Sequence, residues 1–463
     1  MKDFLTSPNK IVAAIAVMIA TIVLLMPTPD GLDPKLVKAG AVLFAAVAVY
    51  ASHALPDHFT SLSFMLMAVI LGVAPANVAF SGFMSSAVWM LFGGLFIGLA
   101  IQHTGLTDRI GRIGTRLGHL SYVKVLMMVT FASLSLGFFM PASISRVIIL
   151  VPIAFAIATA LGFKEGRPGR MGIALAAGMG TFIPGSGILP ANLPNVVMSG
   201  ATETIYKLPF TYGEFLLWHF PVTGFLKAII LVLVLAWMYP DKRDDTEQTP
   251  TDVEPGTTSQ RLLTFILAAT MCLWATDFIH RVAPGHISLF ASLIIMLPLL
   301  KLVPDDALQK HINLTSFFYV AGILSVGAVV QHVGFGTTIA NYLIEVTNPQ
   351  PGQTFINFVT LSMLSMILCV FTTAPGAPVV LAPMAQELSQ AVGMPLFTVV
   401  NIMTHGFATI LFPYIGPPFV IAIALTKMPV GQGLKLCFVM AAISILLLMP
   451  LTYLWWQWLG FFK

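Results

Sequence analysis

Charged residues and cysteine are scarce in this sequence. Only 9% of its 463 residues are charged and 57% are hydrophobic, whereas a soluble domain carries roughly 25% charged residues. This shortage excludes a large water-soluble domain. The three cysteines, Cys272, Cys369 and Cys437, lie in apolar stretches without the spacing of a metal site or a redox pair. The formal net charge of +4 needs no nucleic-acid partner to explain it.

Acidic residues are missing from the long apolar runs. Every Asp and Glu falls in a terminus, a loop or the end of a predicted span. Cation antiporters and proton pumps usually need a carboxylate inside the membrane, so this absence favours an anion as cargo. An integral-membrane enzyme would present clusters of acidic, His or Lys residues at a membrane face. The short loops lack such clusters, so we predict a transporter rather than an enzyme, without a cofactor.

The apolar runs themselves predict the fold class. Residues 11–26 and 215–238 approach or exceed the ~20 residues that cross a bilayer. Many such runs predict an all-α polytopic membrane protein, with about eleven transmembrane helices plus two re-entrant hairpins. The chain is therefore expected to sit in a lipid bilayer as a multi-pass protein.

A polar linker and two repeated motifs divide the chain into two halves. Gly93, Gly98, Gln102, His103 and Gly105 recur, each displaced by 229 positions, as Gly322, Gly327, Gln331, His332 and Gly334. Lys207, Pro209 and Gly213 recur as Lys427, Pro429 and Gly433. We predict an N-terminal span (1–35), a first inverted repeat (36–240, hairpin near 122–161), a polar cytoplasmic linker (241–259) and a second inverted repeat (260–463, hairpin near 353–390).

The distribution of basic residues predicts the orientation of the chain in the membrane. With eleven crossings and a cytoplasmic N-terminus, sixteen loop Lys and Arg residues fall inside and five outside. This bias fits the positive-inside rule. We therefore expect the inner (plasma) membrane, with the two repeats inverted because an odd number of crossings separates them.

Breaks at matching places in the two halves indicate the transport site. The first break is 140–146, around Pro141, and the second is 372–378, around Pro375 and Gly376. Two further spans carry three prolines each, at 184–194 and 413–418, which an uninterrupted helix cannot hold. Free backbone N–H groups at such breaks bind anions well. Plain kinks in packing helices are the alternative interpretation.

Arg146 is the most informative single residue. A guanidinium inside a membrane segment is costly and is a functional candidate by default, and its planar fork suits carboxylate, sulfonate or phosphate. Snorkelling to the interface is the alternative. Lys227, in the middle of the span 215–239, could snorkel or pair, and its role stays open, as does that of His405.

Several segments together resemble the divalent anion–sodium symporter family of the anion permease superfamily. They are residues 89–109 (WMLFGGLFIGLAIQHTGLTDR), the break near Ser143, the Asn-Leu-Pro-Asn segment 192–195 and the Gly-Glu-Phe segment 213–215, where the next long span begins. The resemblance covers nearly the whole chain. It implies a homodimer, an elevator-type alternating-access mechanism, and a di- or tricarboxylate or sulfate as cargo.

The family's Ser-Asn-Thr motif is degraded here. Residues 142–144 read Ala-Ser-Ile and residues 373–375 read Thr-Ala-Pro, so neither copy keeps the Asn or the final Thr. In the family those residues help to hold sodium and substrate. The resemblance thus implies Na⁺ as a candidate coupling ion, while the departures favour an anion exchanger or a sodium-independent carrier. We hypothesise that Arg146 supplies the positive charge that sodium supplies in relatives.

These arguments single out two groups of residues. Those predicted to bind the small anion are Ser143, Ser145, Arg146, Asn192, Asn195, Thr373, Pro375, Gly376, Gly416 and Pro417. Those of the candidate cation site are Ala142, Ser143, Ala191, Thr373 and Ala374.

Overall fold

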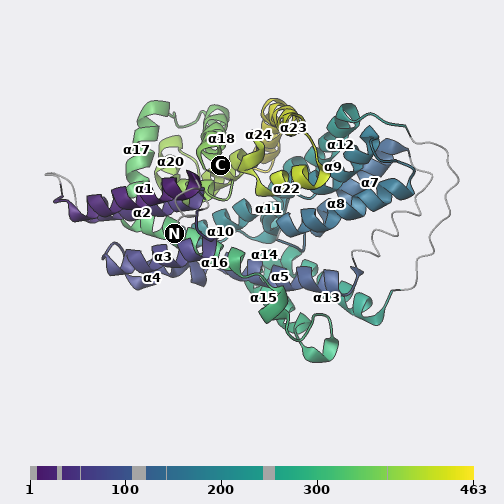
Figure 1. The fold of residues 1–463 in the computed structure, drawn as a ribbon. Coiled ribbons are helices and arrows are strands. Elements are labelled where there is room, and N and C mark those ends of the chain that lie inside the picture. The colour runs from purple at the N-terminus through teal and green to yellow at the C-terminus, as the bar shows by residue number, and fades with distance from the viewer. Residues whose placement is uncertain are drawn as a thin grey trace.

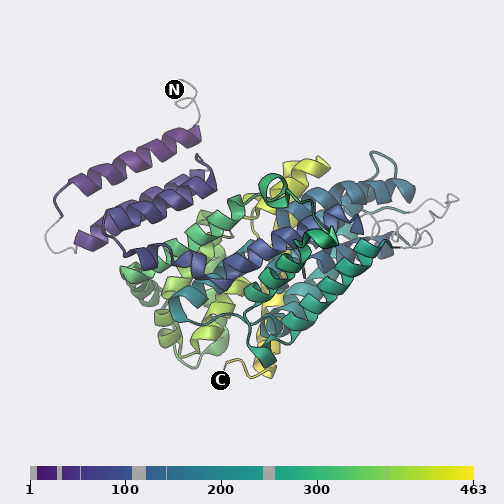
Figure 2. The same ribbon diagram turned by 90° about the horizontal axis from the view of Figure 1, so that it is seen from below.

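The protein is a bundle of helices that runs through both halves of the chain (Figures 1 and 2). The structure is a computed structural model that describes residues 8–28, 34–52, 54–106, 121–141, 143–242, 256–372 and 374–462. Within these ranges every regular element is a helix and no strand occurs. The prediction of an all-α polytopic membrane protein is confirmed.

The helices before the linker form a first series. They are α1 (Pro8–Leu25), α2 (Pro34–Ser52), α3 (Asp57–Ile70), α4 (Ala76–Ala79), η2 (Ser81–Met84), α5 (Ser86–His103), α7 (Tyr122–Leu136), α8 (Ser143–Ala160), α9 (Pro168–Gly180), η3 (Pro184–Gly187), η4 (Leu189–Ala191), α10 (Leu193–Tyr206), α11 (Tyr212–His219), η5 (Phe220–Leu226) and α12 (Lys227–Met238).

The helices after the linker form a second series. They are α13 (Thr258–Ala275), α14 (Asp277–His280), α15 (Pro284–Ile295), η6 (Pro298–Leu300), η7 (Ala307–His311), α16 (Thr315–His332), α17 (Phe335–Thr347), α18 (Thr354–Phe371), α19 (Ala377–Leu381), η8 (Ala382–Met384), α20 (Ala385–Val392), α21 (Leu396–Phe407), η9 (Pro413–Ile415), α22 (Pro417–Thr426), α23 (Val430–Ile443), η10 (Ser444–Leu448) and α24 (Met449–Trp458).

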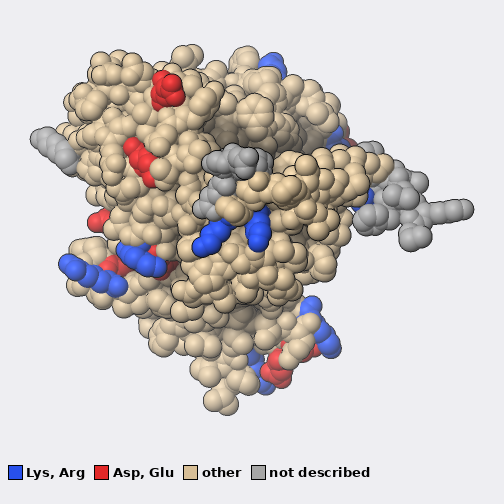
Figure 3. All heavy atoms as spheres, turned by 90° about the vertical axis from the view of Figure 1, so that its left-hand side faces the viewer, with Lys and Arg blue, Asp and Glu red and all other residues tan. Residues whose placement is uncertain are grey.

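Six helices in the described part of the chain are long and apolar enough to cross a bilayer. They are Ser86–His103, Ser143–Ala160, Tyr212–Met238, Thr315–His332, Thr354–Phe371 and Val430–Trp458, and shorter apolar helices accompany them. The predicted total of about eleven crossings, which counts the shorter helices as well, stays a prediction. On the face drawn in Figure 3, charged side chains form separate small groups on an otherwise uncharged surface.

The linker ends slightly earlier than predicted. Helix α13 begins at Thr258, two residues before the expected start at 260. The reason is a capping box, in which the Thr257 side chain accepts from the Gln260 backbone N–H and the Gln260 side chain accepts from the Thr257 backbone N–H. Most of the rest of the linker, residues 243–255, lies outside the described residues.

Equivalent elements follow one another in the same order in the two series. Helices α5 and α16 begin and end 229 positions apart, the same offset as the repeated motif that they carry. Lys207 after α10 and Lys427 after α22 both adopt the left-handed conformation that ends a helix, with φ of 60° and 54°. Each series then continues into a long helix that contains a π-helical turn, η5 in the first and η10 in the second.

The two series exchange partners instead of packing separately. Helix α15 packs on α5 and α3 packs on α16, so each long motif-bearing helix is covered by a helix from the other series. Likewise α22 packs on α8, and α19 packs on α10. The hairpins and interrupted spans are thereby joined across the two halves.

Close helix crossings explain the first glycine of the repeated motif. A Cβ atom added to Gly93 would lie 2.4 Å from the Ser288 carbonyl oxygen on α15, and one added to Gly322 would lie 2.3 Å from Ser61 Cβ on α3. Both distances are far inside van der Waals contact. The repeat therefore preserves two close crossings, α5 on α15 and α16 on α3.

We expect Gly93→Ala to lower the thermal unfolding midpoint of the purified protein, because the new methyl group meets backbone atoms and overpacking costs about 1–3 kcal/mol. Gly431→Ala is the matched control, since a Cβ atom there meets nothing within 4 Å. Equal midpoints for the two variants in a thermal-shift assay would contradict the close-crossing explanation.

Candidate anion-binding site

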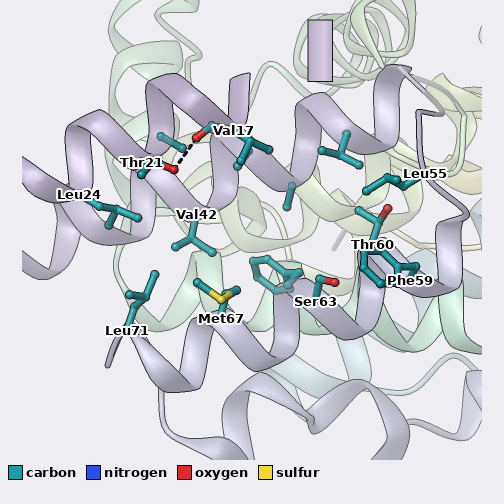
Figure 4. A pocket seen from close by; sticks show the side chains of 15 residues that line it. Val17, Thr21, Leu24, Val42, Leu55, Phe59, Thr60, Ser63, Met67 and Leu71 are labelled. Atoms are coloured by element: carbon teal, nitrogen blue, oxygen red, sulfur yellow. Dashed lines mark hydrogen bonds between the residues drawn. The ribbon is translucent and has the colours of Figure 1, made fainter. Parts of the chain in front are cut away.

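A pocket between the N-terminal helices is unsuited to an anion. Helices α1, α2 and α3 enclose a pocket of about 310 Å³ (Figure 4). Its walls are almost wholly apolar, including Val17, Val42 and Met67, and the Thr21 hydroxyl donates to the Val17 carbonyl oxygen. An anion needs hydrogen-bond donors or positive charge, so the site has to be sought elsewhere.

Two interrupted spans meet near the middle of the bundle. In the first, α9 stops at Gly180, two short 3₁₀ turns follow, and α10 starts at Leu193. In the second, α21 stops at Phe407, η9 follows, and α22 starts at Pro417. Pro184, Pro190 and Pro194 each occupy the first or second position of a new element, where a missing N–H does no harm. The prolines thus break the spans as the sequence predicts.

The first hairpin tip is held by Arg146, which is completely buried. Its Nε donates to Thr181 Oγ1 at 2.6 Å, and one terminal nitrogen donates to the carbonyl oxygens of Thr181 at 3.0 Å and Ala191 at 2.8 Å. The other terminal nitrogen donates to the Met140 carbonyl oxygen. One side chain therefore joins the tip before α8 to the end of α9 and to the end of η4.

The oxygens around Arg146 carry partial negative charge for a structural reason. Thr181 is the C-terminal cap of α9 and Ala191 is the last residue of η4. Carbonyl groups at helix C-termini lack intrahelical partners and attract cations. Within the described part of the chain no ion pair involves Arg146, so backbone oxygens and one hydroxyl surround its charge.

The second hairpin tip is attached differently. The Ala374 N–H donates to the Ile415 carbonyl oxygen at 3.0 Å, and the Tyr414 hydroxyl donates to the Val370 carbonyl oxygen at 2.7 Å. No side-chain cation takes part in these bonds. The tip is nevertheless fixed to the loop before α22, as the first tip is fixed to the loop before α10.

A small cavity, the central cavity, lies where the tips and loops converge. Its lining residues are Phe182, Ile183, Ser186, Asn192, Pro194, Asn195, Ala374, Phe407, Ala408 and Ile410. Its volume of about 10 Å³ has room for about one water molecule. A dicarboxylate therefore needs the walls to separate before it can enter.

Two asparagines present oxygen atoms at the central cavity. Asn192 Nδ2 donates to the Phe182 carbonyl oxygen at 3.0 Å, and Asn195 Nδ2 donates to the carbonyl oxygens of Ser186 and Ile188 at 3.0 and 3.1 Å. These bonds fix the amide orientations. The Oδ1 atoms of both residues are buried and accept no hydrogen bond from the described residues, so they can accept one from a ligand.

The structure brings only some of the predicted residues together. Asn192, Asn195 and Ala374 line the central cavity, and Gly416 adjoins it, because a Cβ atom there would lie 2.7 Å from the Phe182 ring. Ala191 contacts Arg146 through its carbonyl oxygen. The other described residues of the prediction do not line the cavity: Ser143, Ser145, Arg146, Ala191, Pro375, Gly376, Gly416 and Pro417. Ala142 and Thr373 lie outside the described residues.

Buried polar groups on and around α21 were only partly foreseen: the sequence singled out His405 with its role open, and did not single out Asn401, His219 or Ser362. Asn401 Oδ1 is 2.9 Å from His219 Nε2, and one turn later both ring nitrogens of buried His405 lack a partner among the described residues. Buried Ser362 on α18 also has an unpartnered hydroxyl. The sequence signal that could have revealed these groups is the presence of histidine and asparagine within an apolar span. Their partners come from distant segments and could not be predicted from it.

Comparison with known proteins identifies the family. A family model described as the sodium:sulfate symporter transmembrane region matches residues 7–462. An L-tartrate/succinate antiporter of Escherichia coli K12 is 22% identical over 411 residues, covering 81% of this chain and 80% of the relative. An uncharacterized transporter of Haemophilus influenzae is 21% identical over 443 residues, covering 92% and 93%.

Among solved structures, the YdaH transporter of Alcanivorax borkumensis matches with a TM-score of 0.51 at 15% identity, covering 87% of this chain and 89% of that one. At this identity the likeness concerns the fold alone. The family match, by contrast, spans nearly the whole sequence and confirms the resemblance found from the motifs. The chain therefore belongs to the sodium:sulfate symporter family, the divalent anion–sodium symporters, and is an anion transporter.

Proposed function

We propose that this chain exchanges small dianions, dicarboxylates first among them, without requiring sodium. The observation that carries the proposal is the cage of backbone oxygens around the Arg146 guanidinium. In transporters with discontinuous helices, helix C-termini and unwound carbonyls hold the coupling cation, and helix N-termini face the anion. Here a resident side-chain cation occupies such carbonyls at the end of α9.

The anion is proposed to bind at the opposite helix ends. Helices α10 and α22 start beside the central cavity, with Asn192 and Gly416 as their N-terminal caps. The positive ends of their dipoles favour an anion there. Tartrate or succinate is a reasonable first substrate class, because a relative over most of the chain is named as an antiporter of these two acids.

Sodium symport is the second candidate. The unpartnered Oδ1 atoms of Asn192 and Asn195 are acceptors, and oxygen acceptors suit a cation better than a carboxylate. Of the residues expected at a cation site, Ala374 lines the same cavity. The family model also takes its description from sodium:sulfate symport. The transport assay below separates the two candidates.

An elevator-type movement is proposed for the hairpins and interrupted spans. Packing of α22 on α8 and of α19 on α10 joins these elements across the two halves, so they can move as one body. Helices α5, α15, α16 and α3 would form the fixed part. We further propose a homodimer in the inner membrane with a cytoplasmic N-terminus, on the basis of the family resemblance and the bias of basic residues.

Labelled-succinate uptake into proteoliposomes tests the coupling. We expect uptake that depends on internal succinate, tartrate or sulfate and changes by less than about twofold when an inward sodium gradient is added. If uptake requires the sodium gradient and does not depend on an internal anion, the protein is a sodium symporter and the exchange proposal is wrong. Absence of uptake with succinate, tartrate and sulfate would reject the proposed function.

Arg146→Met should abolish this exchange. The variant loses the four hydrogen bonds that the buried guanidinium donates. Losing even one or two such bonds costs about 3 kcal/mol, which corresponds to a more than hundredfold loss of exchange activity. Arg261→Met, at an exposed arginine of α13, is the control and should transport normally. The smaller Arg146→Ser leaves room for an ion and should recover part of its activity in high sodium. Full exchange by Arg146→Met would refute the resident-cation role.

A further inference from the structure

A second buried cation lies beside the central cavity. Lys227 is the first residue of α12, directly after the π-helical turn η5, and only 3% of it is exposed. Its Nζ donates to the Ala408 carbonyl oxygen at 3.0 Å. Among the described residues, no ion pair includes this lysine. A lysine buried in an apolar span without a carboxylate is costly and therefore a functional candidate.

Its acceptor corresponds to an acceptor of Arg146. Ala408 is the C-terminal cap of α21, the first arm of the second interrupted span, and Thr181 is the C-terminal cap of α9, the first arm of the first. Arg146 donates to the Thr181 carbonyl oxygen at 3.0 Å, the same distance as from Lys227 to Ala408. Each half thus presents the corresponding helix-terminal carbonyl to one buried side-chain cation, and both cations come from the first half.

The position of Ala408 connects Lys227 to the proposed site. Ala408 lines the central cavity together with Asn192, Asn195 and Ala374. The ammonium is bonded to this wall residue. A negative charge bound in an enlarged cavity would lie close to it, with little water between them to screen the attraction.

The surroundings leave the charge of Lys227 uncompensated. The nearby titratable groups on the packed elements are His405, on the same face of α21, and His219, bonded to Asn401. The carboxylates of two other helices packed on α21 bind other groups: one oxygen of Glu387 accepts from Thr337, and Glu203 accepts from Ser85 and Ser86. A bound anion is therefore the charge partner that the described residues do not supply.

We infer that Lys227 is a second resident counter-cation of the transport site, and that Lys227 and Arg146 together select anions that carry two negative charges. This inference rests on the proposed function and names its substrate class by charge. A purely structural Lys227, capping α21 through the Ala408 carbonyl oxygen, would influence stability but would not discriminate anions by charge.

The test compares two probes of nearly equal size, succinate and its monoamide succinamate, which carries one carboxylate fewer. Both are measured as inhibitors of labelled-succinate exchange in wild-type and variant proteoliposomes. We expect the wild type to favour succinate over succinamate, and Lys227→Met to reduce that preference roughly ten- to hundredfold, because a bond to a charged partner is lost. Lys38→Met, at an exposed lysine of α2, is the control and should keep the preference.

Two further variants make each outcome decisive. Lys227→Gln keeps an N–H donor for the Ala408 carbonyl oxygen but removes the charge, so it should resemble Lys227→Met, whereas Lys227→Arg should retain the preference for succinate. An unchanged preference in the Met and Gln variants overturns the inference and leaves the proposed function standing. Failure of both neutral variants to fold also overturns it, since the lysine would then be a structural requirement. Absence of wild-type exchange with any of the anions above rejects the proposed function itself.

Discussion

The hydrogen bonds of the Arg146 guanidinium are the interaction on which the candidate site depends. They gather the Met140, Thr181 and Ala191 carbonyl oxygens around one charge. A buried charge is tolerated only when its hydrogen-bonding capacity is met, so separating any of these three segments from the guanidinium carries a large free-energy penalty. The first hairpin tip, the end of α9 and the turn before α10 therefore behave as one rigid unit, which fixes where α10 begins.

The two halves share a backbone plan but have diverged in chemistry. Corresponding helices, left-handed caps and π-helical turns recur in both. The cations do not come from corresponding elements, because Arg146 lies on a hairpin helix and Lys227 on a long span. What has been preserved is the carbonyl group that each cation caps, at Thr181 and Ala408. The unpaired carbonyl groups at these helix ends attract positive charge, and cations from different elements can bind them.

Patterns local in sequence predicted most of the architecture. Two helices, Tyr122–Leu136 and Ser143–Ala160, occupy the range 122–161, and the re-entrant hairpin there stays a prediction; prolines mark the interruptions of the later spans. Local breakers also end α15 at Ile295, since Pro298 and the left-handed Lys301 follow it. The partners of Arg146 and Lys227 could not be predicted, since the lysine and its acceptor are 181 positions apart. The π-helical turn that precedes Lys227 has no recognised sequence pattern either.

The central cavity shows which contacts must change during transport. Its volume of about 10 Å³ cannot hold a dicarboxylate, so some of its lining side chains have to move before an anion can enter. Four hydrogen bonds keep the Arg146 unit together, whereas a single bond links Lys227 to Ala408 of the other half. A new bond from the ammonium to an anion would offset the loss of this one, since a hydrogen bond to a charged group contributes about 1.5–3 kcal/mol. The ammonium can therefore transfer from the Ala408 carbonyl oxygen to an arriving anion while the Arg146 unit stays intact.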